Sequence, residues 1–494
     1  MKLIQLQILK NTIDSQLELF SKPKSFKEYY EDETYGRTGN QEVYFECFTL
    51  RNQLLDYALV CKNWFQYVSI NYFNAHYLAY NSRNNQYLSK IKESIFSLFQ
   101  VANIKELFFF DTDYHKSIGT ALEHIRKLTS LERINLHTVN YELATEINRT
   151  FPHLKLQLVL IDYIMEDFSF SNLDSIEFVH MDINDLAREI IYDGPGFELD
   201  FSIFDRWRVN SMFLEYDEAC GGGVYHISYS KLFQIQTLRY LTIDKVDHVN
   251  ASELVDSIND HLVRLKISVL FSGFSLEEED NVSYVDDEES KEYCNMCDNM
   301  YNHKTEIIST HRLSHWVDFC SKLATNKTLE KLSLSNYCKA HVIKSQDVTQ
   351  ISYLLSQSLT SNNTLKSLAI SCYVLDEAFF QSLSQYKSIN SLKLYDLTQL
   401  HLQFLCAALK TNNTIQYLNI SSYADPHQKE AFAEFLTSLD DNNTLSEIKV
   451  AILFEEHQLE DFIPENLRSN HHVVYKEFLQ YRQLYVRRDV KNKQ

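Results

Sequence analysis

The C-terminal half of the chain repeats one pattern of apolar and polar positions. Four segments align without gaps over their shared core: WVDFCSKLATNKTLEKLSLSNY, ISYLLSQSLTSNNTLKSLAISCY, LQFLCAALKTNNTIQYLNISSY and FAEFLTSLDDNNTLSEIKVAIL. Each has apolar residues at helical spacing, a polar corner of the type N-x-T or N-N-T, and an apolar-x-x-apolar-x-apolar run that is typical of a short strand. The pattern therefore predicts a helix, a turn and a strand that recur as one unit.

The apolar residues of the predicted strands, here called the strand anchors, set the period. First anchors of successive strands are 36, 24, 26 and 30 residues apart. The anchors are Leu329/Leu332/Leu334, Leu365/Leu368/Ile370, Ile389/Leu392/Leu394, Ile415/Leu418/Ile420 and Leu445/Ile448/Val450. Residues 311 to 455 resemble the ribonuclease-inhibitor-like class of leucine-rich repeats, in which a helix ends near the asparagine corner and leads into an L-x-x-L-x-L strand. The resemblance implies an α/β fold, a solenoid with parallel strands on its concave face and helices outside.

This sequence departs from that repeat class after each strand. The ninth position from the first leucine, where the class usually has Asn or Cys, is Tyr337, Tyr373, Leu397, Tyr423 and Leu453 here. We therefore expect the usual side-chain ladder to be absent and the loops to be irregular, because buried loop backbone needs other partners.

The same strand phrase recurs upstream in a looser form. Its anchors are Ile104/Leu107/Phe109, Leu131/Ile134/Leu136, Leu173/Ile176/Phe178, Leu238/Leu241/Ile243 and Leu262/Leu265/Ile267, with Val209/Met212/Leu214 as a further candidate. Between Leu262 and Leu329 the step is 67 residues, which is too long for one repeat. We predict degenerate repeats over 76–272, an acidic and mobile insertion over 273–310, and regular repeats over 311–470.

The N-terminal residues 1–75 are predicted to form a small helical module. Residues 50 to 70 place apolar side chains at helical spacing, and the string ALVCKNWF at 58 to 65 resembles the second half of the F-box. The resemblance implies docking to the Skp-type adaptor of a cullin-RING ubiquitin ligase, through Leu9, Leu55, Leu59, Val60 and Trp64. The alternative is a helical cap that covers the exposed core of the first repeat.

Charge and composition exclude several classes of function. The formal net charge is −20, which would repel a nucleic-acid backbone, and no stretch approaches 18 uninterrupted apolar residues. Every glycine lies at or before Gly273, so the C-terminal half cannot form a Gly-rich phosphate cradle. We expect a cytoplasmic or nuclear protein without a nucleic-acid or membrane partner, a cofactor or an enzymatic activity.

The insertion holds the chain's candidate metal ligands. Residues 277 to 292 carry nine carboxylates and one lysine, and Cys294, Cys297 and His303 follow with ligand types that zinc uses. A structural zinc module usually has a second tight pair, whereas His315 and Cys320 fall within or beside a predicted helix. We therefore expect no metal and a flexible insertion with two reduced thiols.

The C-terminal residues 471–494 are predicted to form an amphipathic capping helix and a basic tail. In each strand the residues between the leucines point to the concave face, which is the expected site of a protein partner. The candidate residues there are Lys331, Ser333, Lys393, Tyr395, Tyr417, Asn419 and Lys449. The sequence thus predicts a non-catalytic recognition module, interpreted first as a ubiquitin-ligase substrate adaptor. The alternatives are an interaction scaffold without a ubiquitin link and a regulator of a small GTPase.

Overall fold

The computed structural model of the chain describes residues 75–78, 104–109, 118–137, 141–160, 173, 176–182, 201–215, 229–244, 251–269, 313–335, 345–422, 434–435, 442, 444–452, 472–478 and 481–487. The chain divides into two compact units. Unit 1 is Met1–Pro195 with Phe201–Tyr216, and unit 2 is Gly196–Asp200 with Asp217–Gln494.

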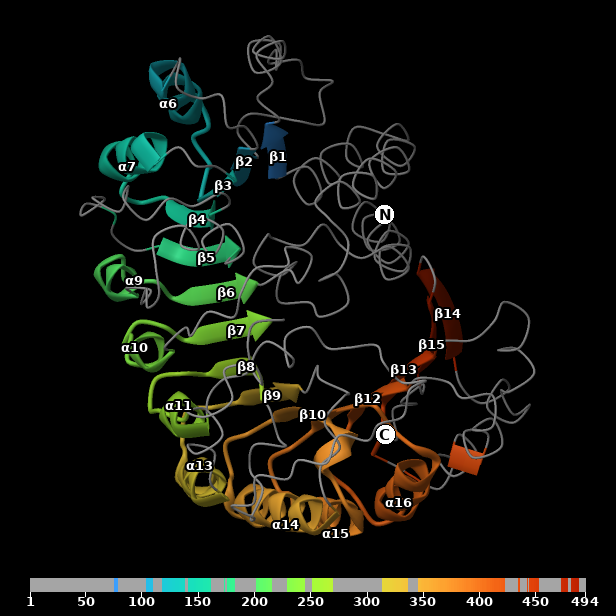
Figure 1. Cartoon of the computed structure of the whole chain (residues 1–494). Helices are drawn as coiled ribbons and strands as arrows, with labels where there is room; N and C mark the ends of the chain where they lie inside the picture. Colours follow the sequence, from blue (N-terminus) through green and yellow to red (C-terminus); the bar gives the residue numbers. More distant parts are fainter. Residues whose placement is uncertain are drawn as a thin grey trace, which may run out of the picture. The chain divides into compact units, whose positions relative to one another are not determined.

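In unit 1, parallel strands follow one another in chain order and helices alternate with them along the chain (Figure 1). The strands are β1 (Ala75–Leu78), β2 (Glu106–Phe109), β3 (Arg133–His137), β4 (Lys155–Leu160), β5 (Ile176–Asp182) and β6 (Ser211–Glu215). The helices are α6 (Ile118–Lys127), α7 (Tyr141–Thr150) and α9 (Ser202–Arg206).

Unit 2 has the same arrangement, with its helices along one side of the strands (Figure 1). Its parallel strands are β7 (Tyr240–Asp244), β8 (Arg264–Ser268), β9 (Lys331–Ser335), β10 (Ser367–Ser371), β11 (Ser391–Tyr395), β12 (Tyr417–Ser422) and β13 (Glu447–Ile452). Its helices are α10 (Ser230–Phe233), α11 (Ala251–Ser257), α13 (Leu313–Thr325), α14 (Ser345–Ser361), α15 (Glu377–Ser382) and α16 (Gln399–Leu409), with 3-10 turns η7 (Cys372–Val374) and η8 (Leu383–Gln385). The predicted α/β arrangement of parallel strands and alternating helices is confirmed.

The strand anchors of unit 2 stack in register and form its core. In successive strands Leu332, Leu368, Leu392, Leu418 and Ile448 are direct partners. Each of these five side chains is at most 5% exposed. Parallel strands that are buried in this way share one apolar core, because no single repeat can bury its leucines alone. The predicted anchors of the regular repeats are therefore confirmed.

In unit 1 the strands β1 and β4 have no predicted counterpart, and one predicted anchor of β5 is wrong. Leu154 directly precedes β4, and Leu156 and Leu158 lie within it, an L-x-L-x-L spacing that does not match the repeat phrase. A register shift between β4 and β5 then pairs Leu156 with Ile176 but Leu158 with Val179. The extra residue of this bulge puts Val179, and not Phe178, in the anchor row. Phe178 is nevertheless buried.

A ladder of asparagines joins the repeats of unit 2 at the corner before each strand. Asn362 Oδ1 accepts hydrogen bonds from the backbone N–H groups of Thr364 (2.8 Å) and Leu365 (2.7 Å). Its Nδ2 donates to the backbone carbonyl of Leu323 in the preceding repeat at 2.7 Å. The corner asparagines with this double role are Asn259, Asn326, Asn362, Asn412 and Asn442. The corner asparagines thus form hydrogen bonds with buried backbone N–H and carbonyl groups for which the sequence predicts no partner.

The loops after two described strands are irregular, as the residues at the ninth position predict. After β10 the chain turns into η7, where Tyr373 is 40% exposed. After β11, Asp396 has a φ of 53°, a left-handed conformation that is uncommon for a residue with a side chain. Leu397 then fills the core at 3% exposure. At the ninth position of this repeat, the apolar side chain of Leu397 therefore packs into the core instead of forming hydrogen bonds.

The acidic insertion leaves the strand order of unit 2 intact. Strand β8 pairs directly with β9, with Leu265 opposite Leu332. Across the same gap Asn326 Nδ2 donates to the Asn259 carbonyl, 67 residues earlier, at 2.7 Å. The predicted mobility of the insertion concerns residues outside the described ones and stays a prediction.

The C-terminal residues form strands and not the predicted helix. The strands β14 (His472–Phe478) and β15 (Tyr481–Arg487) pair antiparallel, and β15 also pairs antiparallel with β13. Both segments are rich in Val, Tyr and Phe, which favour strands, and the free edge of β13 offers unpaired backbone groups. Pairing with that edge outweighs the helical pattern of the isolated sequence.

The ladder predicts a large difference between two neighbouring asparagines. We expect Asn362→Ala to lower the free energy of unfolding by at least about 2 kcal/mol, because it leaves buried backbone donors and a carbonyl without partners. Urea unfolding followed by circular dichroism measures this change. Asn363→Ala, at an exposed position of the same corner, should cost under about 0.5 kcal/mol. Equal effects of the two variants would contradict the role of the ladder.

Candidate functional site

The predicted partner-binding residues lie on strands β9, β11, β12 and β13 of unit 2, at positions that alternate with the buried anchors. We call this set the Lys393 face: Lys331, Ser333, Lys393, Tyr395, Tyr417, Asn419 and Lys449. Lys393, Asn419 and Lys449 are register partners in one row across β11, β12 and β13. Tyr395 and Tyr417 lie on the same two strands, β11 and β12, on either side of that row. The structure therefore brings five of the seven predicted residues together.

The other two residues lie farther along the sheet. Strand β10 separates β9, with Lys331 and Ser333, from β11. Lys331 is exposed, whereas Ser333 is 6% exposed and its hydroxyl has no hydrogen-bond partner. Ser333 continues the row of Lys393, Asn419 and Lys449, with Ala369 of β10 between Ser333 and Lys393. The row therefore has a small apolar residue next to Lys393.

Lys393 is the electrostatically unusual residue of the face. Its side chain is half-buried, and its Nζ lies 4.6 Å from the centroid of the Tyr395 ring. Burial and, to a smaller extent, the like charge of Lys449 together lower the pKa of the Lys393 ammonium to about 7. The aromatic ring attracts the cation but does not neutralise it. A group with a displaced pKa on a strand face is a candidate binding residue.

Tyrosines border this lysine on the same face. Tyr417 is 46% exposed, and Tyr395 is half-buried beneath Lys393. Exposed aromatic side chains combine a large apolar area with a hydroxyl group and are frequent energetic centres of protein interfaces. The combination of a poorly solvated ammonium, a second lysine and two tyrosines suits a ligand with a carboxylate next to an apolar group.

The predicted adaptor-binding and metal residues lie outside the described residues. These are Leu9, Leu55, Leu59, Val60, Trp64, Cys294, Cys297 and His303. Cys320 lies on α13, where burial raises the pKa of its thiol, so it faces the core. Within the described ranges no group of three His, Cys, Asp or Glu side chains is placed to hold a metal ion. No helix that the structure describes has the length and apolar character needed to cross a membrane.

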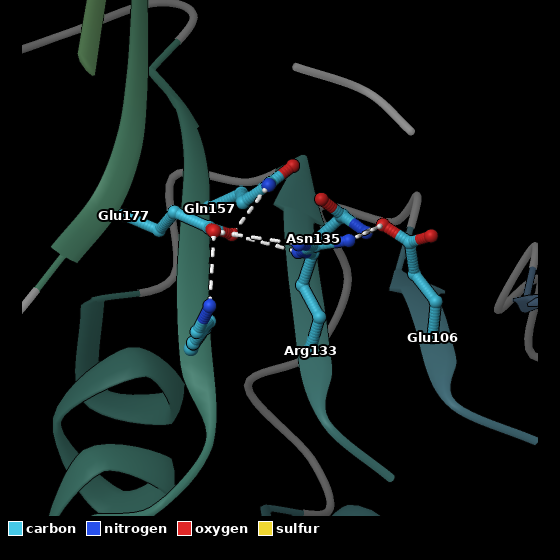
Figure 2. Close-up of polar contacts among 6 residues, drawn as sticks. Glu106, Arg133, Asn135, Gln157 and Glu177 are labelled. Atoms are coloured by element: carbon cyan, nitrogen blue, oxygen red, sulfur yellow. Dashed lines mark hydrogen bonds and ion pairs between the residues drawn. The ribbon is translucent and has the colours of Figure 1, made fainter. Parts of the chain in front are cut away.

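Unit 1 has a polar cluster that the sequence analysis did not identify: Glu106, Arg133, Asn135, Lys155, Gln157 and Glu177, from β2, β3, β4 and β5 (Figure 2). Arg133 lies between two carboxylates. Its Nε donates to Glu177 Oε2 at 2.7 Å and its Nη2 to Glu177 Oε1 at 3.3 Å. Its Nη1 forms an ion pair with Glu106 Oε1 at 3.5 Å. The strands of this cluster match the repeat pattern only loosely, and Glu177 is the extra residue of the bulge in β5. No sequence motif therefore predicted the cluster.

The two carboxylates of this cluster differ in their electrostatic surroundings. Burial raises the pKa of Glu106, because it outweighs the hydrogen bond from Asn135 and the attraction of Arg133. Burial also disfavours the charged form of Glu177, but hydrogen bonds from Arg133 and Gln157 outweigh it and lower that pKa. Arg133 thus interacts with both carboxylates, and the pKa of Glu106 is raised because its burial outweighs these contacts.

Comparison with known proteins adds no identification. No protein-family model matches the chain, and no curated protein sequence matches it.

The displaced pKa of Lys393 predicts a pH dependence of stability. Its folded pKa of about 7 is below the value of about 10.4 for a lysine in an unfolded chain, so the unfolded state binds more protons between these values. Stability should therefore rise with pH from about 7 to 10 through this group. Urea unfolding at several pH values measures the rise.

The control for this prediction is a lysine without such surroundings. Lys393→Met should reduce the rise in stability, whereas Lys327→Met, at an exposed corner position before β9, should keep it. A pH profile of Lys393→Met that parallels the wild type would show that Lys393 is normally solvated.

Proposed function

We propose that the chain is a non-catalytic protein-recognition module of the leucine-rich repeat type, and that the Lys393 face binds a partner segment with carboxylates and apolar anchors. Stacked anchors, parallel strands and alternating helices support the repeat type. Because a fold alone does not determine function, the proposal depends on the chemistry of the face.

The observation that carries the proposal is the half-buried ammonium of Lys393 beside Lys449. Burial lowers the pKa of Lys393 because its ammonium loses hydration, and the like charge of Lys449, two strands away in the same row, adds a smaller repulsion. A partner carboxylate would offset both costs and form charge-assisted hydrogen bonds. Binding of such a partner should therefore be accompanied by proton uptake at Lys393, and it should weaken as the pH rises above about 7.

The tyrosines give the proposed site its apolar part. The side chain of Tyr417 is 46% exposed, and Tyr417 precedes Asn419 by two residues on β12, so both side chains lie on the same face. An apolar side chain of the partner could cover its ring while the adjacent carboxylate reaches Lys393. Such a pairing of one buried aromatic anchor with one desolvated charge is typical of interface centres.

Selection of displayed peptides on the full-length protein tests this proposal. We expect enrichment of peptides that combine Asp or Glu with an apolar or aromatic residue, and weaker binding at pH 8.5 than at pH 6.5. Tyr395→Ala with Tyr417→Ala should reduce binding about tenfold or more without a matching loss of stability. Lys327→Met, at an exposed position outside the face, should bind as the wild type does. Enrichment of basic peptides, or unchanged binding by the double variant, would refute this site.

A second part of the proposal concerns ubiquitin ligation. The string ALVCKNWF at residues 58 to 65 supports an F-box-like module that binds a Skp-type adaptor through residues such as Val60 and Trp64. We expect the full-length protein to copurify with a co-expressed Skp-type adaptor, and Trp64→Ala to reduce the copurified amount at least fivefold. The Tyr395→Ala, Tyr417→Ala double variant should retain the adaptor. Absence of the adaptor from preparations of the wild-type protein would favour the helical cap instead.

A further inference from the structure

The helix α16 begins with a capping box in which a histidine stands where Glu or Gln is usual. Thr398 is the N-cap residue, and its hydroxyl accepts a hydrogen bond from the backbone N–H of His401 at 3.4 Å. In return, the backbone N–H of Thr398 donates to His401 Nδ1 at 3.2 Å. A capping box needs a side-chain acceptor at this position, and an imidazole nitrogen is an acceptor only while it carries no proton.

The second ring nitrogen of His401 determines which tautomer is present. Nε2 lies 3.3 Å from the backbone carbonyl of Leu375, which connects η7 to α15 in the preceding repeat. A carbonyl oxygen only accepts hydrogen bonds, so Nε2 carries the hydrogen and donates it. Nδ1 is therefore the nitrogen without a proton, which agrees with its contact to the Thr398 N–H. The neutral ring thus joins the repeat of β10 to the first turn of α16, which follows β11.

Protonation of Nδ1 removes the acceptor of the capping box. An imidazolium has two donors and no acceptor, so its Nδ1–H would face a second donor, the N–H of Thr398. The hydroxyl oxygen of Thr398 lies 3.0 Å from Nδ1, but it already accepts from the His401 N–H. The positive end of the helix dipole also disfavours a cation in the first turn of α16. The charged ring is therefore incompatible with the closed cap in three separate ways, through its neighbouring donor, its shared acceptor and the dipole.

The groups around His401 do not supply a compensating negative charge. Phe380 of α15 stacks on the imidazole, with 5.9 Å between the ring centroids. The charged side chains of the adjoining elements are Asp376, Glu377, Asp396 and Lys410. Each of the three carboxylates accepts a hydrogen bond from a side chain other than His401. Burial lowers the pKa of His401, and the hydrogen bond to the Leu375 carbonyl raises it by less.

We propose that His401 is an acid-sensitive switch between two repeats: its neutral ring closes the N-terminus of α16, and its protonation opens that cap. Thr398 is exposed, so water reaches the groups that the open cap releases. The released segment, residues 396–398, directly follows Tyr395 at the end of β11. The switch is a property of the fold and does not depend on the proposed function.

The direction of the pKa displacement sets the pH range of the switch. A histidine in an unfolded chain has a pKa of about 6.5, and the pKa of His401 in the folded chain is lower. Between these two values the open form binds the additional proton, so the closed cap loses stability as the pH falls below about 6.5. In this range the ratio of open to closed cap rises by up to about tenfold per pH unit, because one proton is taken up.

Two measurements on the full-length wild-type protein test the switch. Nitrogen NMR of the 15N-labelled histidine rings, with the His401 signal assigned from its loss in a variant, should show His401 protonated at Nε2 only at pH 8. Hydrogen exchange followed by mass spectrometry should show that protection of residues 396–402, corrected for the intrinsic rate, falls about threefold or more from pH 6.5 to pH 5. Residues 391–395 of β11 should keep their protection. A neutral ring protonated at Nδ1, or equal protection of residues 396–402 at both pH values, would overturn the switch.

Matched variants separate the histidine from general effects of acid. His401→Gln retains a side-chain acceptor that does not titrate, so it should keep residues 396–402 protected at both pH values. His153→Gln, at an exposed position of unit 1, should show the same pH dependence as the wild type. An identical loss of protection on acidification in His401→Gln and the wild type would assign the effect to another group and overturn the role of His401.

Discussion

The fold of unit 2 depends on the buried asparagine at the corner between helix and strand. Each corner asparagine accepts from the backbone just before its own strand and donates to a backbone carbonyl of the preceding repeat, as Asn442 does with Leu445 and Leu409. Both sets of backbone groups lie at an element end, where regular hydrogen bonding stops. A single asparagine side chain therefore links two neighbouring repeats and sets the distance between them. The strands that carry the Lys393 face are spaced by these links.

The ladder also explains how the array tolerates variation. Tyr386 stands where the repeat of β11 would have its asparagine, and its hydroxyl contacts Ser382 Oγ at 2.8 Å. Asn412 still reaches Leu383 in that repeat, and Ser388 Oγ donates to the Asn362 carbonyl. Local substitution and even the long acidic insertion are accommodated, because each link joins only neighbouring repeats.

Both units place ionisable groups on strand faces where burial disfavours a charge. Burial lowers the pKa of Lys393 and raises the pKa of Glu106, so it disfavours the charged form of both groups. Burial of a charge costs free energy unless a partner compensates it, so such places are expected where a ligand completes the set. The same repeat geometry thus builds two strand faces on which burial displaces a pKa in opposite directions.

The sequence by itself determined the anchors, the corner and the alternation of helix and strand, because apolar spacing reports which side of an element faces the core. It also placed Lys393 and Tyr395 on the face opposite the leucines. The tertiary structure alone decided which residues meet across strands, such as Arg133 with Glu177, 44 residues away. It also decided the bulge at β5 and the hairpin at the edge of β13. These features depend on neighbours that are distant in the chain, and a local pattern of residues contains no information about them.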